Sequence, residues 1–373
     1  MKFTLLSMIS LVAMAMTLFT TVDAMDVGAP WAADSRWAPR ITGNKHLNKY
    51  QHWEMRNVKE LSRAGLEYVP SYWGDKKAHN WPATKRAFKR YRYKHLLCLN
   101  EPDVPSQAGY SPARAANAFQ SICAPMRRYG TKISSPQICY DLKWLESFTR
   151  ILKKRGGHYD FVALHYYGSW NSLSKFKKYI SQAHRQFGKD IWITEIGVTS
   201  ASHPSTGQAK KFFIDATNWA ASTGYVKAIF PFIMFAKPPD SFASSQNAGF
   251  NHNGQLRSVA KWFRYYSVGK RSLDGEHIVS RDITRRHHAL LKRIEEDNTD
   301  EELWDDQTQT AEPEHCDGRC KQIDEYLEKA KPFDIDAADE HEIEAAKIEE
   351  PEKDAFTEED HLAPHDEDDD EEF

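Results

Sequence analysis

Two stretches of the sequence decide the fold: K-H-L-L-C-L-N-E-P-D at residues 94–103 and D-I-W-I-T-E-I-G-V at residues 190–198. Each is a short apolar run of strand length that leads into a glutamate, Glu101 in the first stretch and Glu195 in the second. Such runs, bounded by polar and turn residues, are typical of buried parallel strands. In a closed α/β barrel the functional groups lie where the strands end, at the C-terminal face. The two stretches therefore predict two carboxylates at one face of a parallel sheet.

Similar apolar runs recur along the chain and alternate with segments of helical spacing. The strand candidates are residues 26–31, 50–53, 66–70, 96–99, 132–136, 159–164, 191–193 and 226–235, and the helix candidates are residues 55–64, 83–93, 111–129, 141–154, 173–187, 206–223 and 258–266. Regular alternation predicts a parallel sheet with crossover helices. Eight units in about 250 residues is the size of a (β/α)8 TIM barrel. An open doubly wound sheet is the alternative, but no glycine-rich fingerprint follows the first strand, so we predict the barrel.

The net charge of −3 combines two regions of opposite sign. Residues 301–373 contain 30 acidic and 6 basic residues, a net charge of −24, and the first 300 residues contain 23 acidic and 44 basic residues, a net charge of +21. Because an acid-rich segment with few large apolar residues cannot offset its ordering entropy, we expect a largely disordered tail at 301–373. Residues 271–300 are interpreted as a basic helical linker, and residues 25–270 as the barrel domain. The basic residues are scattered along helical segments without a recognised motif, so nucleic acid is not an expected partner.

Residues 1–24 have the pattern of a signal peptide. Lys2 supplies the positive end, an apolar stretch follows, and Val22-Asp23-Ala24 offers small residues at the cleavage position. The alternative is an uncleaved anchor helix, which the Ser and Thr residues of the stretch disfavour. No other segment approaches the length of a membrane span, so we expect a secreted, extracellular protein that does not associate with membranes.

The five cysteines suggest disulfides rather than a metal site. Cys98 lies inside a strand candidate and is expected to be a buried cysteine without a disulfide. Cys123 and Cys139 flank one passage from helix to strand and are expected to pair, as are Cys316 and Cys320. Zinc at the last two is disfavoured, since two cysteines do not fill four coordination positions.

Glu101 and Glu195 follow the fourth and seventh of the eight strand candidates, which places them nearly opposite each other across the barrel mouth. Each alone would be interpreted as a surface carboxylate. Together they match the requirement of glycosidic bond cleavage, one acid to protonate the leaving oxygen and one carboxylate beneath the sugar. Mutual repulsion is expected to raise the pKa of one of them. A carboxyl separation of about 5 to 5.5 Å would predict retention of configuration, and about 6.5 to 9.5 Å inversion.

Five further residues are candidates for substrate binding: Asn100, Trp53, Trp73, His165 and Tyr167. Asn100 precedes Glu101 and can donate a hydrogen bond to a sugar hydroxyl. His165 and Tyr167 end the sixth strand candidate and are expected to orient Glu195 or contact sugar. Tryptophan rings suit the C–H faces of pyranoses. The alternative for each aromatic ring is a place in the core. We expect no metal and no cofactor.

A set of motifs in order along the chain resembles glycoside hydrolase family 128. They are G-A-P-W at 28–31, Y-V-P-S-Y-W-G at 68–74, L-N-E-P-D at 99–103, S-S-P at 134–136, D-F-V-A-L-H-Y-Y-G at 160–168, W-I-T-E-I-G at 192–197 and N-H-N-G at 251–254. The resemblance covers residues 28–266 and none of the tail. It implies a TIM barrel, a retaining mechanism and endo-acting cleavage of β-1,3-glucan, with Glu101 as the acid/base and Glu195 as the nucleophile.

Two positions depart from the family's pattern. Tyr166 stands where the family usually has Trp, and Met234-Phe235-Ala236 stands where it has Trp-Phe-Gly. These departures imply an altered substrate preference and one aromatic platform fewer.

The leading hypothesis is a secreted, monomeric endo-β-1,3-glucanase whose partner is a polysaccharide. The alternative is a weakly active or inactive barrel that serves as a matrix or carbohydrate-binding protein, with the 301–373 tail binding calcium or a mineral surface weakly. A third possibility is that the acidic tail folds back on the basic body and modulates access to the cleft, an effect that salt would screen.

Overall fold

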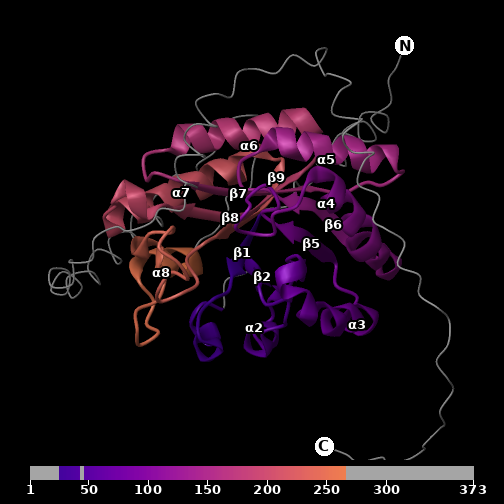
Figure 1. Ribbon diagram of the computed structural model, residues 1–373. Helices are drawn as coiled ribbons and strands as arrows, with labels where there is room; N and C mark the ends of the chain where they lie inside the picture. The colour runs from indigo at the N-terminus through magenta and orange to yellow at the C-terminus, as the bar shows by residue number, and fades with distance from the viewer. Residues whose placement is uncertain (1–24, 43–45, 266–373) are drawn as a thin grey trace, which may run out of the picture. The chain divides into compact units, whose positions relative to one another are not determined.

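The computed structural model describes residues 25–42 and 46–265 (Figure 1). Four predictions lie outside these residues: the signal peptide at 1–24, the linker at 271–300, the acidic tail at 301–373, and the pairing of Cys316 with Cys320.

The described chain contains all eight predicted strand positions. The strands are β1 (Asp26–Pro30), β2 (Leu47–Gln51), β3 (Glu67–Tyr68), β4 (Ser71–Tyr72), β5 (His95–Asn100), β6 (Lys132–Gln137), β7 (Val162–Gly168), β8 (Ile191–Val198) and β9 (Val226–Pro231). Only Val69 and Pro70 separate β3 from β4. The two short strands stand in place of the predicted third strand at 66–70 and extend beyond it to Tyr72. The last strand ends at Pro231 rather than at residue 235 as predicted.

All strand pairs are parallel, and they close into a ring. Six strands form one sheet in the order β3-β2-β1-β9-β8-β7, and three form another in the order β4-β5-β6. The third strand joins the two sheets, since Val69 N donates to Tyr50 O (2.8 Å) and Leu97 N donates to Pro70 O (2.9 Å). Bridges between β6 and β7 close the other side. The predicted TIM barrel is confirmed.

Helices connect successive strands and surround the barrel (Figure 1). They are α2 (Lys59–Arg63), α3 (Trp81–Tyr91), α4 (Pro112–Ala118), α5 (Leu142–Lys154), α6 (Leu173–Phe187), α7 (Thr206–Thr223) and α8 (Ser258–Tyr265). Side chains cap several of their starts: Ser111 Oγ accepts from Arg114 N before α4, and Asp141 accepts from Lys143 N and Trp144 N before α5. Across residues 25–42 and 46–265, no helix is both long enough and apolar enough to span a bilayer.

The helix predicted at 111–129 is not regular. A π-helical turn (Phe119–Cys123) and a 3-10 helix (Ala124–Tyr129) follow α4. Pro125 has no backbone N–H to donate, so the regular helical hydrogen-bond pattern cannot continue through it.

The N-terminal half of the barrel is filled by large side chains. Leu97, Phe161, Trp192 and Phe230 form part of one buried cluster there. Gly28 permits this packing, because a Cβ at that position would collide with the Phe230 ring.

Four ionisable residues gather at the N-terminal end of the barrel, and we call them the basal cluster: Asp26, Lys49, Glu67 and His95. Lys49 Nζ lies 2.8 Å from Glu67 Oε2 and 3.2 Å from Asp26 Oδ2. His95 Nδ1 lies 3.0 Å from Glu67 Oε1.

The predicted disulfide pairing is wrong. Cys98 forms a disulfide with Cys123, and Cys139 is a buried cysteine outside it. Alternation along β5 explains the pairing. Leu97 packs inside the barrel, so Cys98 points outward toward the helical segment that contains Cys123.

Candidate active site

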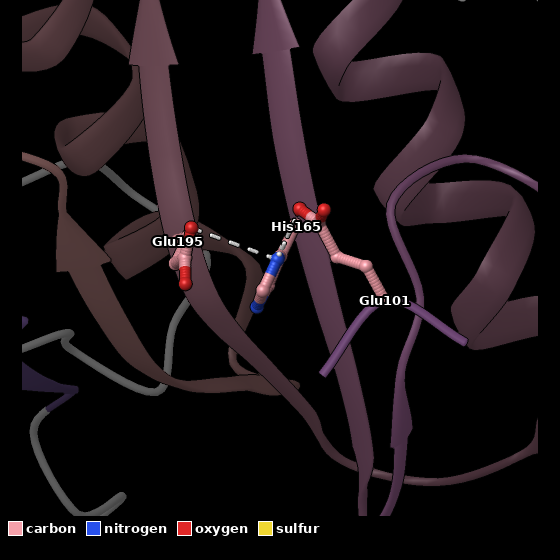
Figure 2. A group of neighbouring side chains, drawn as sticks. All are labelled: Glu101, His165 and Glu195. Carbon is pink, nitrogen blue, oxygen red and sulfur yellow. Dashed lines mark hydrogen bonds and ion pairs between the residues drawn. The ribbon is translucent and has the colours of Figure 1, made fainter. Parts of the chain in front are cut away.

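Three side chains converge at the C-terminal end of the barrel (Figure 2). Glu101 directly follows β5, His165 lies on β7 and Glu195 lies on β8. All three are buried: Glu101 is 3% exposed, Glu195 5% and His165 0%. The sequence-predicted carboxylates therefore come together with one of the predicted accessory residues between them.

The two carboxyl groups are close to each other. His165 Nδ1 lies 2.8 Å from Glu101 Oε1 and 3.7 Å from Glu195 Oε2. One oxygen of each glutamate and this nitrogen all lie within 4.8 Å of one another. An approach of this kind is compatible with the carboxyl spacing of about 5 to 5.5 Å found in retaining glycosidases.

Glu195 is oriented by two donors. Trp53 Nε1 donates to Oε1 at 2.7 Å, and the Tyr167 hydroxyl donates to Oε2 at 2.6 Å. Burial raises the pKa of Glu195, and the charge of Glu101 adds to this. His165 and the two donors act in the opposite direction without cancelling it. The two hydrogen bonds thus fix the orientation of the Glu195 carboxylate, while its pKa depends on the charges of Glu101 and His165.

His165 lies between the carboxylates. Burial disfavours its imidazolium form, but Glu195 and Glu101 outweigh burial and raise the pKa of His165 above its ordinary value. Its Nε2 is buried and has no protein partner among the described residues. Because the ring is fully buried, His165 contacts the carboxylates rather than forming a surface of the cleft.

A cavity of about 370 Å³ opens over the carboxylates. The four other predicted substrate-binding residues line it together with both glutamates: Trp53, Trp73, Asn100 and Tyr167. Among the residues that sequence reasoning did not select, it is lined by Trp31, His52, Glu54, Lys77, Gln107 and Phe232. A mixture of aromatic rings and polar groups suits a sugar ring with its hydroxyls.

Trp53 and Trp73 differ in what they offer a sugar. Trp53 is half-buried at the cleft and packs its edge against Phe232. Trp73 is only 7% exposed, and the amine of Lys77 lies 5.5 Å from the centre of its ring. Glu54 holds that amine at 2.6 Å. Part of the Trp73 surface is therefore already covered, and no signal in the sequence indicates this.

The same three side chains, Glu101, His165 and Glu195, are close enough to hold a metal ion. The hydrogen bond between His165 and Glu101 accounts for their proximity without an ion. Cleavage by two carboxylates also requires none.

A closed parallel barrel with two buried glutamates facing each other at the strand ends, beneath an aromatic and polar cleft, defines a glycosidase-type site. Comparison with known proteins agrees. The model of the family described as "Glycosyl hydrolase catalytic core" matches residues 28–263, and the chain belongs to this family. No curated protein sequence matches the chain.

Solved structures of glycoside hydrolase family 128 share the fold. An exo-β-1,3-glucanase of subgroup VI from Aureobasidium namibiae is 20% identical, with a TM-score of 0.57 over 66% of this chain and 97% of that one. An endo-β-1,3-glucanase of subgroup I from Amycolatopsis mediterranei, bound to laminaripentaose, is 22% identical, with a TM-score of 0.54 over 66% and 100%. An oligosaccharide-binding protein of subgroup VII from Trichoderma gamsii is 19% identical, with a TM-score of 0.52 over 65% and 94%. The resemblance found in the sequence motifs is confirmed.

Proposed function

We propose that this protein is a retaining endo-β-1,3-glucanase in which Glu101 is the acid/base and Glu195 the nucleophile. The observation that carries the proposal is the short distance between the two buried carboxyl groups, with one oxygen of each within 4.8 Å of the other. That spacing allows direct attack on the anomeric carbon.

The surroundings of the two glutamates favour these roles. Glu195 receives hydrogen bonds at both oxygens, which supports the ionised form that a nucleophile needs. The charge of Glu101 raises the pKa of Glu195. This contribution vanishes when Glu101 carries the proton, so a protonated Glu101 and an ionised Glu195 support each other.

In the first step Glu101 gives its proton to the glycosidic oxygen while Glu195 forms a bond to the anomeric carbon and the leaving sugar departs. In the second step Glu101 takes a proton from water, and the water oxygen displaces Glu195. His165 stays hydrogen-bonded to Glu101, and its Nδ1 lies 3.7 Å from Glu195, whose charge favours the imidazolium form of His165.

The choice of β-1,3-glucan rests on the family resemblance and on the substrates named for the structurally similar enzymes. Endo action rests on the resemblance alone, since the similar structures include both endo- and exo-acting enzymes. Secretion is part of the proposal and rests on the signal-peptide pattern of residues 1–24.

A second candidate function is oligosaccharide binding without catalysis. The structure from Trichoderma gamsii is a protein of that kind with the same fold. In this chain the partly covered Trp73 and the Met234-Phe235-Ala236 sequence favour it, and the close pair of glutamates opposes it. Weak cation binding by the acidic segment at 301–373 belongs to this second candidate.

The test is reducing-end release from linear β-1,3-glucan by the wild type, Glu101→Gln and Glu195→Gln. Each substitution should lower kcat by about 10³-fold or more, since each removes a group that acts in the transition state. Glu67→Gln is the matched control, because Glu67 also contacts a histidine but belongs to the basal cluster. It should keep its activity.

The products then decide the finer points. The anomer first released reports retention or inversion, and oligosaccharides of mixed length rather than glucose alone report endo action. A wild type that binds laminarin oligosaccharides but hydrolyses no β-1,3-, mixed-linkage or β-1,4-glucan would refute the enzyme and support the binding protein.

A further inference from the structure

The backbone around Glu101 is strained. Leu99 has a φ of 56° and Glu101 a φ of 43°, so two of three consecutive residues lie in the left-handed region that disfavours side chains. The register of β5 against β6 is also irregular between Cys98 and Asn100. Such conformations persist only where the surroundings hold them. We call residues 99–101 the Glu101 turn. The contacts that stabilise this turn also fix the direction in which the Glu101 side chain points.

Neighbouring strands hold the inner side of the Glu101 turn. Glu101 N donates to Gln137 O at 2.8 Å, and Gln137 Nε2 donates to Leu99 O at 3.4 Å. Asn100 N donates to Trp73 O at 2.9 Å. These contacts tie the turn to β6 on one side and to the end of β4 on the other.

Asp103 holds the segment that leaves the turn. Its carboxylate accepts from three successive amides in the loop after β6: Cys139 N at 3.1 Å, Tyr140 N at 3.1 Å and Asp141 N at 3.2 Å. Asp141 caps the 13-residue helix α5, so Asp103 lies at the N-terminal end of this helix. Backbone amides and the helix dipole both favour an anion there.

The charge of Asp103 is costly at this place. Burial raises its pKa to about 6, and the charge of Glu101 adds to the rise, while the backbone amides oppose it. An asparagine could accept from the same amides with one oxygen and would not repel Glu101.

We propose that Asp103 is a positioning residue: it ties the strained turn that bears Glu101 to the N-terminal end of α5, and so holds the Glu101 carboxyl against His165. The catalytic consequence rests on the proposed function. The placement of the carboxyl is a structural claim that can be tested without it.

The kinetic test compares Asp103→Ala and Asp103→Asn with the same two substitutions at Asp160. Asp160 is the matched control because its carboxylate accepts from Ile133 N at 2.7 Å, near the other end of β6 and remote from the turn. Asp103→Ala should lower kcat by about 100-fold with little change in KM, since a misplacement of about 1 Å in a catalytic group costs this much. Asp103→Asn should fall between the wild type and Asp103→Ala. The Asp160 variants should lose thermal stability and keep kcat.

A spectroscopic test does not depend on activity. The imidazole ¹⁵N and ¹H signals of His165 report its hydrogen bond to Glu101. They should shift in both Asp103 variants, as far as each folds, and stay unchanged in the Asp160 variants. If the wild type hydrolyses no glucan and the His165 signals still respond to Asp103, the proposed function fails and the positioning role stands. Folded Asp103→Asn with unchanged His165 signals and unchanged kcat would overturn the inference.

Discussion

Each end of the barrel holds a histidine whose Nδ1 contacts a glutamate, but the two pairs have different neighbours. In the basal cluster His95 lies 3.0 Å from Glu67, and Lys49 lies 2.8 Å from the other oxygen of that glutamate. At the C-terminal end His165 lies 2.8 Å from Glu101, and the third group is a second carboxylate, Glu195.

The third group changes the behaviour of the glutamates. Burial opposes the charge of Glu67, but hydrogen bonds from His95 and Lys49 outweigh burial and lower its pKa to about 2. The pKa of Glu195 is instead raised by burial and by Glu101. A compensated glutamate stays ionised and serves stability, whereas two glutamates that share one histidine can hold and transfer a proton. The comparison shows that burial and a histidine partner do not by themselves mark an active site.

The largest effect on this comparison is expected at His165. His165→Asn removes the imidazole that lies between the two carboxylates and its hydrogen bond to Glu101, and should lower kcat by about 100-fold. His95→Asn at the other end should keep kcat near the wild-type value. Steady-state kinetics on β-1,3-glucan measure both. Equal losses of kcat in His165→Asn and His95→Asn would contradict the assignment of catalysis to the C-terminal end of the barrel.

A smaller effect is expected in acid stability. The folded-state pKa of Glu67, about 2, lies below its ordinary value of 4.5. Its contribution to the free energy of unfolding is therefore complete above pH 4.5 and lost as the pH falls toward 2. After allowance for its partial exposure, this contribution is about 2 kcal/mol.

Denaturant unfolding of Glu67→Gln from pH 2 to pH 7 measures this term. The variant should be less stable at neutral pH and should lose less stability on acidification than the wild type. Asp34→Asn is the control, because Asp34 pairs with an exposed Arg36 at the surface and its loss should not be measurable. If the free energy of unfolding depended on pH in the same way in the wild type and in Glu67→Gln, then Lys49 and His95 would not lower the pKa of Glu67 as described.

The smallest effect concerns Tyr167, which donates to Glu195. Tyr167→Phe removes a donor to the ionised carboxylate, so the pKa of Glu195 should rise further. The acidic limb of kcat/KM should then move to higher pH, and the maximum should fall about tenfold, the cost of one hydrogen bond to a charged group. The neighbouring Tyr166 bonds Ser172 on the outer side of β7, so Tyr166→Phe should leave the profile unchanged. A shift in both variants would mean that the strand, rather than the hydroxyl, is responsible.

Periodicity and strand-end position were sufficient to predict the barrel and to bring Glu101 and Glu195 together. Helices α6 and α7 have the predicted bounds, 173–187 and 206–223, because their apolar spacing and terminal glycines agree. Position after a strand also selected Tyr167, since parallel strands end at one face.

Other features depend on contacts between distant segments. The pairing of Cys98 with Cys123 follows from which side of β5 a side chain faces and from the register of the π-helical turn, and neither is visible in cysteine spacing. The covering of Trp73 by Lys77 depends on Glu54, a residue 23 positions away along the chain. The positive φ angles of Leu99 and Glu101 are imposed by Gln137 and Trp73 across strand contacts, against the local preference of both residues.

The disulfide between Cys98 and Cys123 has a consequence for how the protein must be made. It fastens the strand that leads to Glu101, and Cys139 lies on the segment after the adjacent strand β6. These three thiols allow three alternative pairings during oxidation, and one of them is native. In a reducing cytosol the two cysteines would stay reduced. Rapid uncatalysed oxidation would leave a share of the chains with a non-native disulfide between Cys139 and one of the other two cysteines. Preparations made with and without a disulfide isomerase should therefore differ in the fraction of molecules that contain the native disulfide, even where their total yield is equal.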